Sequence, residues 1–439
     1  MKNFRTITAT ISFSIALTVA AEARSETLAC RTLRGPCQFL DTVAVLFPDG
    51  APMLVANFGF VFADDTNQWR FACEASLDGL VARARMAPSG AIFLTGARGL
   101  IRYQPRCTST SFGAIAGASA LDVAIDGQDE RRLWLLGEAP RAVYRSSDGG
   151  AHFTTSFTFG PGDSPFRLLP APSRPDTLYA AGERADGRFL LLRSDDGGAS
   201  FASAGDAAPE GVPLDLYVHP SRPEELFLAV RAPDGADALW RSDDAGNRWA
   251  RALALPPPAI FAAFSFGPSG DTVFVGARQP FADPAAPAAE LYVSRDGGRS
   301  FSPAAISGPR GPRYRCLAHH GGLLYACAGG TPNGDDFLLG VSRDEGRTWT
   351  PLLAAAGLAG PEPCRAAACA ETSRWLCDTY GLCGRDGGVG DAATSVNSNG
   401  GCACGVSRRS QPPAYFVFVL VLGLYSAAAG RRPASRSSA

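Results

Sequence analysis

Residues 146–153 read Ser-Ser-Asp-Gly-Gly-Ala-His-Phe, and this short stretch decides the fold. Its pattern, S-x-D-x-G-x-x-[FW], returns four more times along the chain. From serine to serine the spacings are 48, 48, 52 and 48 residues. Self-similarity at a fixed period of about 50 residues indicates a repeat architecture. We call the five copies the box segments.

Four positions in each box segment have a physical role in a hairpin. The Ser ends a strand, and the Asp carboxylate accepts bonds from backbone N–H groups of the turn. The Gly two residues later supplies a positive φ, and the aromatic residue begins the next strand and packs inward. These positions are Ser146, Asp148, Gly150, Phe153, Ser194, Asp196, Gly198, Phe201, Ser242, Asp244, Gly246, Trp249, Ser294, Asp296, Gly298, Phe301, Ser342, Asp344, Gly346 and Trp349.

The box segments resemble the Asp-box of sialidase-like and related β-propellers. In that family the box is a fold element on the rim of the propeller, away from the face that binds ligand. The resemblance therefore implies that these Asp residues are structural, rather than calcium ligands or catalytic acids.

A second repeat, strand–tight turn–strand, precedes each box segment and occurs seven times. Its copies begin at Leu46, Met86, Ala124, Pro170, Val218, Phe266 and Ala318. The first two copies then carry decayed boxes. Asp64 and Trp69 keep the Asp-to-aromatic offset of the first box, whereas 103–112 has lost the pattern of the second.

The sequence predicts an all-β fold, a single seven-bladed β-propeller with four-stranded blades over residues 40–354. Short strands, Gly/Pro turns and about 45 residues per unit are typical of propeller blades. Six or eight blades are the alternatives. The strand–P-S-x-P–strand pattern followed by a box segment is similar to the photosystem assembly factor family and the sortilin ectodomain. That resemblance implies a binding scaffold.

Composition excludes several classes of protein. The chain has 439 residues, of which 46% are hydrophobic and 19% charged, and its formal net charge is -1. This near balance argues against a nucleic-acid partner and against a disordered chain. Lys2 is the only lysine, so a P-loop lysine or a Schiff-base lysine is excluded once the N-terminus is removed.

The N-terminus reads as a secretory signal over residues 1–23. Lys2 and Arg5 form the positive region, 7–21 is apolar, and Ala21-Glu22-Ala23 fits a cleavage site. An uncut N-terminal anchor is the alternative. Residues 24–39 would then form a disulfide-containing lead-in to the propeller.

The C-terminus contains a second targeting signal. Residues 355–383 form a Cys-rich segment, and 384–401, rich in Gly, Ser and Asn, predict a flexible stalk. Residues 402–439 contain Cys402 and Cys404, an uncharged run at 414–430 long enough for a transmembrane helix, and an Arg cluster.

This three-part tail resembles the myxobacterial C-terminal sorting signal. The resemblance implies a sortase-like processing protease, membrane retention, cleavage near Cys402 and display on the cell surface or release from it. A plain C-terminal membrane anchor is the alternative, and either places the protein outside the cytoplasm.

The 12 cysteines agree with export, where thiols pair. Cys316 and Cys327 flank a Gly-Gly turn and are expected to pair with each other. Cys364, Cys369, Cys377 and Cys383 form a tight cluster, which we interpret as a disulfide knot rather than a zinc site because it lacks C-x-x-C and a nearby His. Its pairing cannot be deduced from sequence.

No constellation for catalysis, cofactor or metal binding stands out. The histidines are His152 in a box segment, His219 at a strand end, and His319 and His320 in an expected turn. Sialidases begin their arginine triad in an R-I-P motif that we do not find. Xyloglucan-cleaving endoglucanases need two propellers, and this chain has room for one. Sequence alone cannot place a pair of central carboxylates, which would define a glycosidase.

The sequence therefore predicts a non-catalytic, cell-surface or secreted binding and adhesion module for a protein or a glycan. No cofactor and no nucleic acid is expected, and the membrane is contacted through the C-terminal segment. A glycoside hydrolase and an envelope-assembly scaffold are the alternatives.

Overall fold

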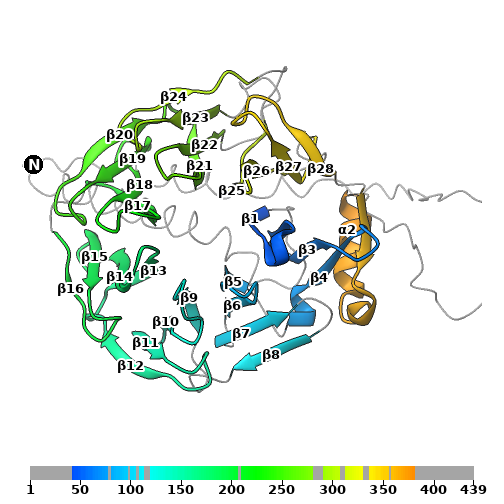
Figure 1. The fold of residues 1–439 in the computed structure, drawn as a ribbon, viewed down its shortest axis with the longest axis horizontal. Helices are drawn as coiled ribbons and strands as arrows, with labels where there is room; N and C mark the ends of the chain where they lie inside the picture. The colour runs from blue at the N-terminus through cyan, green and yellow to red at the C-terminus, as the bar shows by residue number, and fades with distance from the viewer. Residues whose placement is uncertain are drawn as a thin grey trace, which may run out of the picture. The chain divides into compact units, whose positions relative to one another are not determined.

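Short apolar strands separated by turns form seven antiparallel sheets in the computed structural model. It describes residues 42–77, 81–96, 99–104, 108–112, 119–205, 209–279, 290–306, 312–329, 336–354 and 357–380. Each sheet is built on four consecutive strands, and the first gains a fifth strand from the C-terminal segment. The sheets follow one another around a central axis (Figure 1). The protein is therefore a seven-bladed β-propeller, as the repeat predicts.

The first three blades are built from the N-terminal strands. Blade 1 contains β1 (Thr42–Leu46), β2 (Met53–Ala56), β3 (Gly59–Ala63) and β4 (Trp69–Cys73). Blade 2 contains β5 (Val81–Met86), β6 (Ile92–Gly96), β7 (Gly99–Gln104) and β8 (Thr108–Phe112). Blade 3 contains β9 (Ala120–Ile125), β10 (Leu133–Glu138), β11 (Arg141–Ser146) and β12 (Thr154–Thr158).

Four more blades complete the ring. Blade 4 contains β13 (Ser164–Ala171), β14 (Arg174–Glu183), β15 (Phe189–Ser194) and β16 (Ala202–Ser203). Blade 5 contains β17 (Val212–Val218), β18 (Leu226–Arg231), β19 (Asp237–Ser242) and β20 (Ala250–Ala254). Blade 6 contains β21 (Ile260–Phe266), β22 (Val273–Arg278), β23 (Glu290–Ser294) and β24 (Ser302–Pro303). Blade 7 contains β25 (Cys316–His320), β26 (Leu323–Cys327), β27 (Leu339–Ser342) and β28 (Thr350–Leu353).

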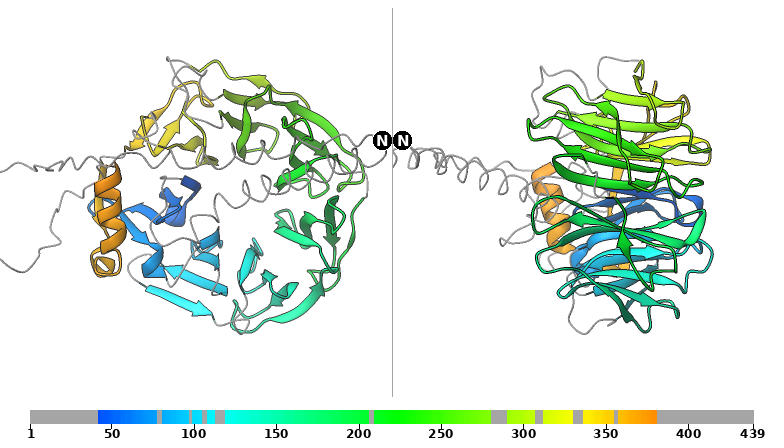
Figure 2. Two further views of the ribbon diagram at one scale, coloured as in Figure 1. Left: turned by 180° about the vertical axis from the view of Figure 1, so that it is seen from behind. Right: turned by 90° about the vertical axis from the view of Figure 1, so that its left-hand side faces the viewer.

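The core lies between the blades, which stack face to face (Figure 2). A middle strand is covered on both faces, so it reads as a continuous apolar run, as in Leu226–Arg231, whose first five residues are all buried. Among the described residues, an apolar cluster joins each pair of neighbouring blades. The cluster between blades 7 and 1 contains Leu54 and Leu339, so the ring is closed.

The C-terminal segment closes the ring in a way that the sequence does not predict. Strand β29 (Leu358–Pro361) adds to the outer edge of blade 1, parallel to β4. Helix α2 (Ala370–Tyr380) follows and lies beside blade 1 (Figure 1). Its Leu376 belongs to the apolar cluster between blades 7 and 1. Residues 358–380 are thus an integral part of the propeller rather than a segment that follows it.

This docking corrects the interpretation of the cysteine cluster as a self-contained knot. Cys369 pairs with Cys73 at the end of β4, with their Cα atoms 5.6 Å apart and 296 residues apart in sequence. The reason is that β29 runs alongside β4 and carries Cys369 to the end of that strand. Cys364 and Cys377 are also disulfide-bonded. Cys383, Cys402 and Cys404 lie outside the described residues.

The predicted disulfide between Cys316 and Cys327 is present. The two residues are direct partners in the β25–β26 register, with their Cα atoms 5.0 Å apart. Within the described residues no helix is long and apolar enough to cross a membrane. The expected signal at 1–23, lead-in at 24–39, stalk at 384–401 and span at 414–430 all lie outside that part of the chain.

Candidate functional site

The five box segments all form the same hydrogen-bonded hairpin. In the first, Ser146 Oγ accepts from the Gly150 backbone N–H at 2.9 Å and donates to Asp148 Oδ1 at 2.8 Å. Asp148 Oδ1 also accepts from the backbone N–H four residues later, at His152, at 3.0 Å. The same bonds recur at Ser194, Ser242, Ser294 and Ser342. Each box segment therefore satisfies the polar groups of its own turn.

The box glycines also fit against the preceding blade. A Cβ atom at Gly198 would lie 2.5 Å from Trp134 Nε1 of blade 3, and one at Gly246 would lie 2.3 Å from Leu191 Cδ2 of blade 4. Both glycines have a positive φ, of +78° and +95°. The decayed first box keeps part of this pattern, since Asp64 Oδ1 still accepts from the backbone N–H of Gln68 at 3.0 Å.

Hydrogen bonds hold the box carboxylates ionised. Bonds from the Ser200 hydroxyl and backbone and from Ser194 lower the pKa of Asp196 to about 2. Bonds from the His152 backbone and side chain likewise lower the pKa of Asp148 below its ordinary value. A carboxylate that is ionised and fully used within its own turn does not donate a proton to a substrate.

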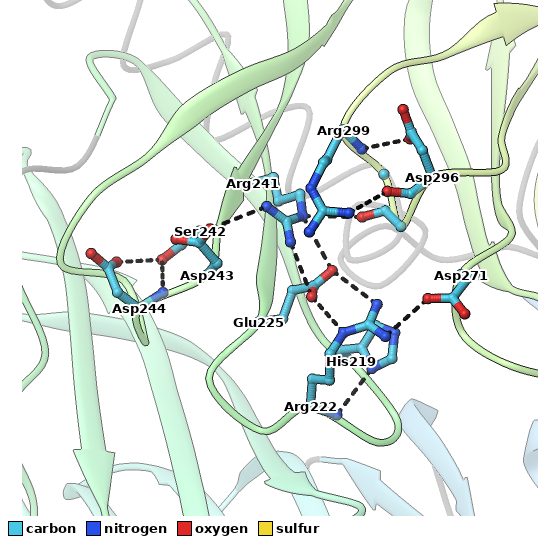
Figure 3. Close-up of polar contacts among 12 residues, drawn as sticks. His219, Arg222, Glu225, Arg241, Ser242, Asp243, Asp244, Asp271, Asp296 and Arg299 are labelled. Atoms are coloured by element: carbon cyan, nitrogen blue, oxygen red, sulfur yellow. Dashed lines mark hydrogen bonds and ion pairs between the residues drawn. The ribbon is translucent and has the colours of Figure 1, made fainter.

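A polar pocket of about 600 Å³ lies between blades 5 and 6 on the side of the box segments. Figure 3 shows its charged groups converging on Glu225, which is buried. Glu225 accepts from Arg222 Nε at 2.6 Å and pairs with Arg241 Nη2 at 3.0 Å. Arg222 Nη1 bonds Asp271 of blade 6 at 2.9 Å, and Arg241 Nε bonds the Gly297 carbonyl at 3.0 Å.

This pocket is one of several equivalent blade junctions. Arg132 of blade 3 bonds Asp176 of blade 4, and Arg295 of blade 6 bonds Glu345 of blade 7. Arg174 Nη1 of blade 4 bonds Glu224 of blade 5 at 2.6 Å. An arginine therefore crosses to an acid of the next blade at each of these junctions. We interpret the groups in Figure 3 as a structural contact between blades.

The four histidines serve local structure. His219 is buried, and its Nδ1 accepts from the backbone N–H groups of Ser221 and Arg222, both at 3.1 Å. Burial lowers the pKa of His219, so the ring is neutral. His319 and His320 end strand β25 rather than lying in the turn, and the ring of His320 stacks on Phe47 at 4.2 Å. Among the described residues no group of three His, Cys, Asp or Glu side chains could hold a metal ion.

A different set of charged residues gathers on the inner strands, around the axis of the ring. In six of the seven inner strands, the pairing with the next strand skips one residue, which is a β-bulge. The first residue after the skip occupies the same position in each blade. From blade 1 to blade 6 these residues are Ala44, Arg83, Asp122, Arg167, Asp215 and Ala263.

Blades 2 to 5 thus carry charges of alternating sign at one level, which, with Arg85, we call the axis cluster. Arg167 binds Asp215 through two bonds, of 2.5 and 2.9 Å, and lies 3.8 Å from Asp122. Asp122 is fully buried and pairs with Arg85 Nη2 at 3.1 Å. The side chains of Arg85 and Asp215 remain 29% and 20% exposed, so solvent reaches the cluster.

The ion pairs fix the protonation of the cluster. Burial alone would lower the pKa of Arg167 and raise that of Asp215, but their mutual attraction outweighs it and moves both the opposite way. The positive charge of Arg167, with burial, lowers the pKa of Arg83. Burial lowers the pKa of Arg85 to about 10, and burial with the charge of Asp215 raises the pKa of Tyr217. The cluster therefore contains three guanidinium groups and two carboxylates, and the hydroxyl of Tyr217 beside it is neutral at neutral pH.

The sequence motifs described above do not include the residues of this cluster. Successive members of the cluster lie about one blade length apart in the sequence. They occupy equivalent positions when the inner strands are aligned with one another. The internal repeat contains this signal, but its most regular positions lie in the turns and the box segments. Those predicted site residues that the structure describes form the box hairpins and disulfides instead.

No protein-family model matches the chain, and no curated protein matches it. Solved structures are similar at low identity. An ancestral GH74 enzyme is 14% identical with a TM-score of 0.45, over 62% of this chain and 38% of that one. YCF48 from Cyanidioschyzon merolae is 14% identical with a TM-score of 0.44, over 62% and 85%. The RRP9 WD40 repeats are 16% identical with a TM-score of 0.48, over 68% and 90%. Likenesses at this level carry no argument about function.

Proposed function

We propose that this protein is a non-catalytic binding module of the Asp-box propeller class, which presents the axis of its ring to a glycan or protein ligand. The observation that carries the proposal is the state of the two carboxylates at the axis. Asp122 and Asp215 are both neutralised by arginines, and Arg167 contacts each of them.

This arrangement favours binding over glycoside hydrolysis. A glycosidase needs one carboxyl group that stays protonated and a second that is free to attack or to activate water. The pKa of Asp215 is held below its ordinary value, and Asp122 is buried against Arg85 and the Leu168 backbone N–H. Both carboxylates are therefore engaged by arginines or backbone N–H groups rather than free to act on a substrate.

Export to the cell surface is part of the proposal. The disulfides Cys73–Cys369 and Cys316–Cys327 support an oxidising compartment. The signal at 1–23 and the sorting tail with Cys402 would provide the route. If Cys402→Ala leaves chain size and surface display unchanged, the sorting role is wrong.

The binding role is tested with the purified full chain on a glycan array, on candidate envelope proteins and with fluorogenic sialosides and xyloglucan oligosaccharides. Saturable binding without turnover is the expected result. Turnover that disappears in Asp215→Asn would refute the proposal and favour the hydrolase alternative.

A further inference from the structure

We propose that the axis cluster binds a singly charged acidic group of a glycan, with Arg83 as the residue that contacts the acid. This inference rests on the binding function proposed above and names the class of ligand. It is carried by the charge balance of the cluster, by the state of Arg83 and by the side chains that surround the axis.

The charge balance leaves one positive charge without a partner. Arg85 and Arg167 are engaged by Asp122 and Asp215, whereas Arg83 makes no hydrogen bond or ion pair with any described residue. Two carboxylates stand against three guanidinium groups, so one negative charge completes the set. A singly charged carboxylate or sulfate ester fits this balance, whereas a doubly charged phosphate monoester would exceed it.

Arg83 is placed to receive such a group. It follows a β-bulge on inner strand β5, at the level of Asp122 on the neighbouring strand β9, and is only half-buried. The charge of Arg167 and burial lower the pKa of Arg83, against the attraction of Asp215 and Asp122. Guanidinium groups form paired hydrogen bonds with planar acids, so an acid at Arg83 would gain bonds as well as charge neutralisation.

Small and aromatic side chains lie on the inner strands beside the charged positions. At the same bulge position, blades 1 and 6 carry Ala44 and Ala263 in place of a charge. Tyr217 and Phe261, on the inner strands of blades 5 and 6, are half-buried. Tyr217 is held flat against Phe264 at a ring-centroid distance of 4.1 Å. A fixed, partly exposed aromatic ring beside a cation suits a sugar ring that bears an acid, which favours a glycan over an acidic peptide.

The test is calorimetric titration of the full chain with four probes. These are a galacturonic acid hexamer, its methyl ester, a kappa-carrageenan hexamer with sulfate esters, and a pentaglutamate peptide. The acidic sugars are expected to bind, and the better of the two identifies the acid. Arg83→Gln should weaken that binding about ten- to hundredfold, the range for a charge-assisted hydrogen bond, and Arg83→Lys should weaken it less.

Arg251→Gln is the matched control, because it removes the same charge from an exposed position on outer strand β20 and should leave binding unchanged. Arg83 makes no hydrogen bond or ion pair with any described residue, so its replacement should not affect folding. The melting temperature of Arg83→Gln, which should equal that of the wild type, tests this. Equal binding by wild type and Arg83→Gln, equal binding of the methyl ester, or tighter binding of the peptide would each overturn the inference. Binding of neutral glycans alone would overturn it too, while leaving the proposed binding function in place.

Discussion

Removing the disulfide that closes the ring should destabilise the protein far more than removing the disulfide within blade 7. Cys73 and Cys369 join blade 1 to the C-terminal segment, across 296 residues of sequence. Cys316 and Cys327 join two adjacent strands, across 11 residues. A cross-link restricts the unfolded chain more when the loop it closes is longer, so the two bonds differ in their effect on the unfolded state.

The size of the effect follows from the two loop lengths. The chain-entropy relation gives about 5.7 kcal/mol for a separation of 296 residues and about 2.8 kcal/mol for a separation of 11 residues at 25 °C. The expected difference in the free energy of unfolding is therefore about 3 kcal/mol. Loss of the packing of α2 against blade 1 would increase it, since Cys369 and Leu376 belong to the same apolar cluster.

The assay is urea denaturation of two double variants, Cys73→Ala with Cys369→Ala and Cys316→Ala with Cys327→Ala, followed by circular dichroism. Both variants remove two thiols and leave the other disulfides intact, so each is the control for the other. Limited proteolysis should also cut first within β29, at residues 358–361, in the variant at Cys73 and Cys369. Equal losses of stability in the two variants would refute the reasoning from ring closure.

Three further predictions concern the box segments and the blade junction. Gly246→Ala should lower the stability of the protein more than Gly235→Ala. Both glycines have a positive φ, which costs about 1–2 kcal/mol for a residue with a side chain, but only a Cβ at Gly246 would also clash with the preceding blade. Thermal melts of the two variants measure the difference. The pKa of Asp196 is lowered to about 2, so its stabilisation is present above pH 4 and lost as pH falls toward 2; the gap in unfolding free energy between wild type and Asp196→Asn should close over that range. Arg241→Ala leaves Glu225 buried with one partner fewer and should cost about 3–5 kcal/mol in urea denaturation, which the double change with Glu225→Gln should partly restore.

The blades could be predicted because residues close together in the sequence determine the turns and strands of each one. In blade 5 the repeat that begins at Val218 contains the turn between β17 and β18, and the box segment begins at Ser242, where β19 ends. Positive φ, an Asp-stabilised turn and an inward aromatic residue all lie within eight residues of one another. Requirements of such short range produce a recognisable sequence pattern. The spacing of this pattern along the chain then gives the number of blades.

Ring closure was not predictable in the same way. The pairing of β29 with β4 joins Leu358 to Trp69, and no local pattern links residues so far apart. Strand β29 has only four residues and two of them are Gly360 and Pro361, so it lacks the apolar alternation of a typical strand. The Cys cluster suggested a knot because its members are close in sequence, whereas the fold brings Cys369 to Cys73.

The charged side chains of the axis cluster are not required by the propeller fold. Buried ion pairs are costly to desolvate, and replacing them with apolar residues is often neutral or stabilising. Blades 1 and 6 show that Ala suffices at the same bulge position, since Ala44 and Ala263 occupy it. Arg83, Asp122, Arg167 and Asp215 are therefore not needed to build a blade. We propose that their place on four consecutive inner strands serves recognition at the axis. This separates the axis cluster from the box carboxylates, each of which binds groups of its own turn.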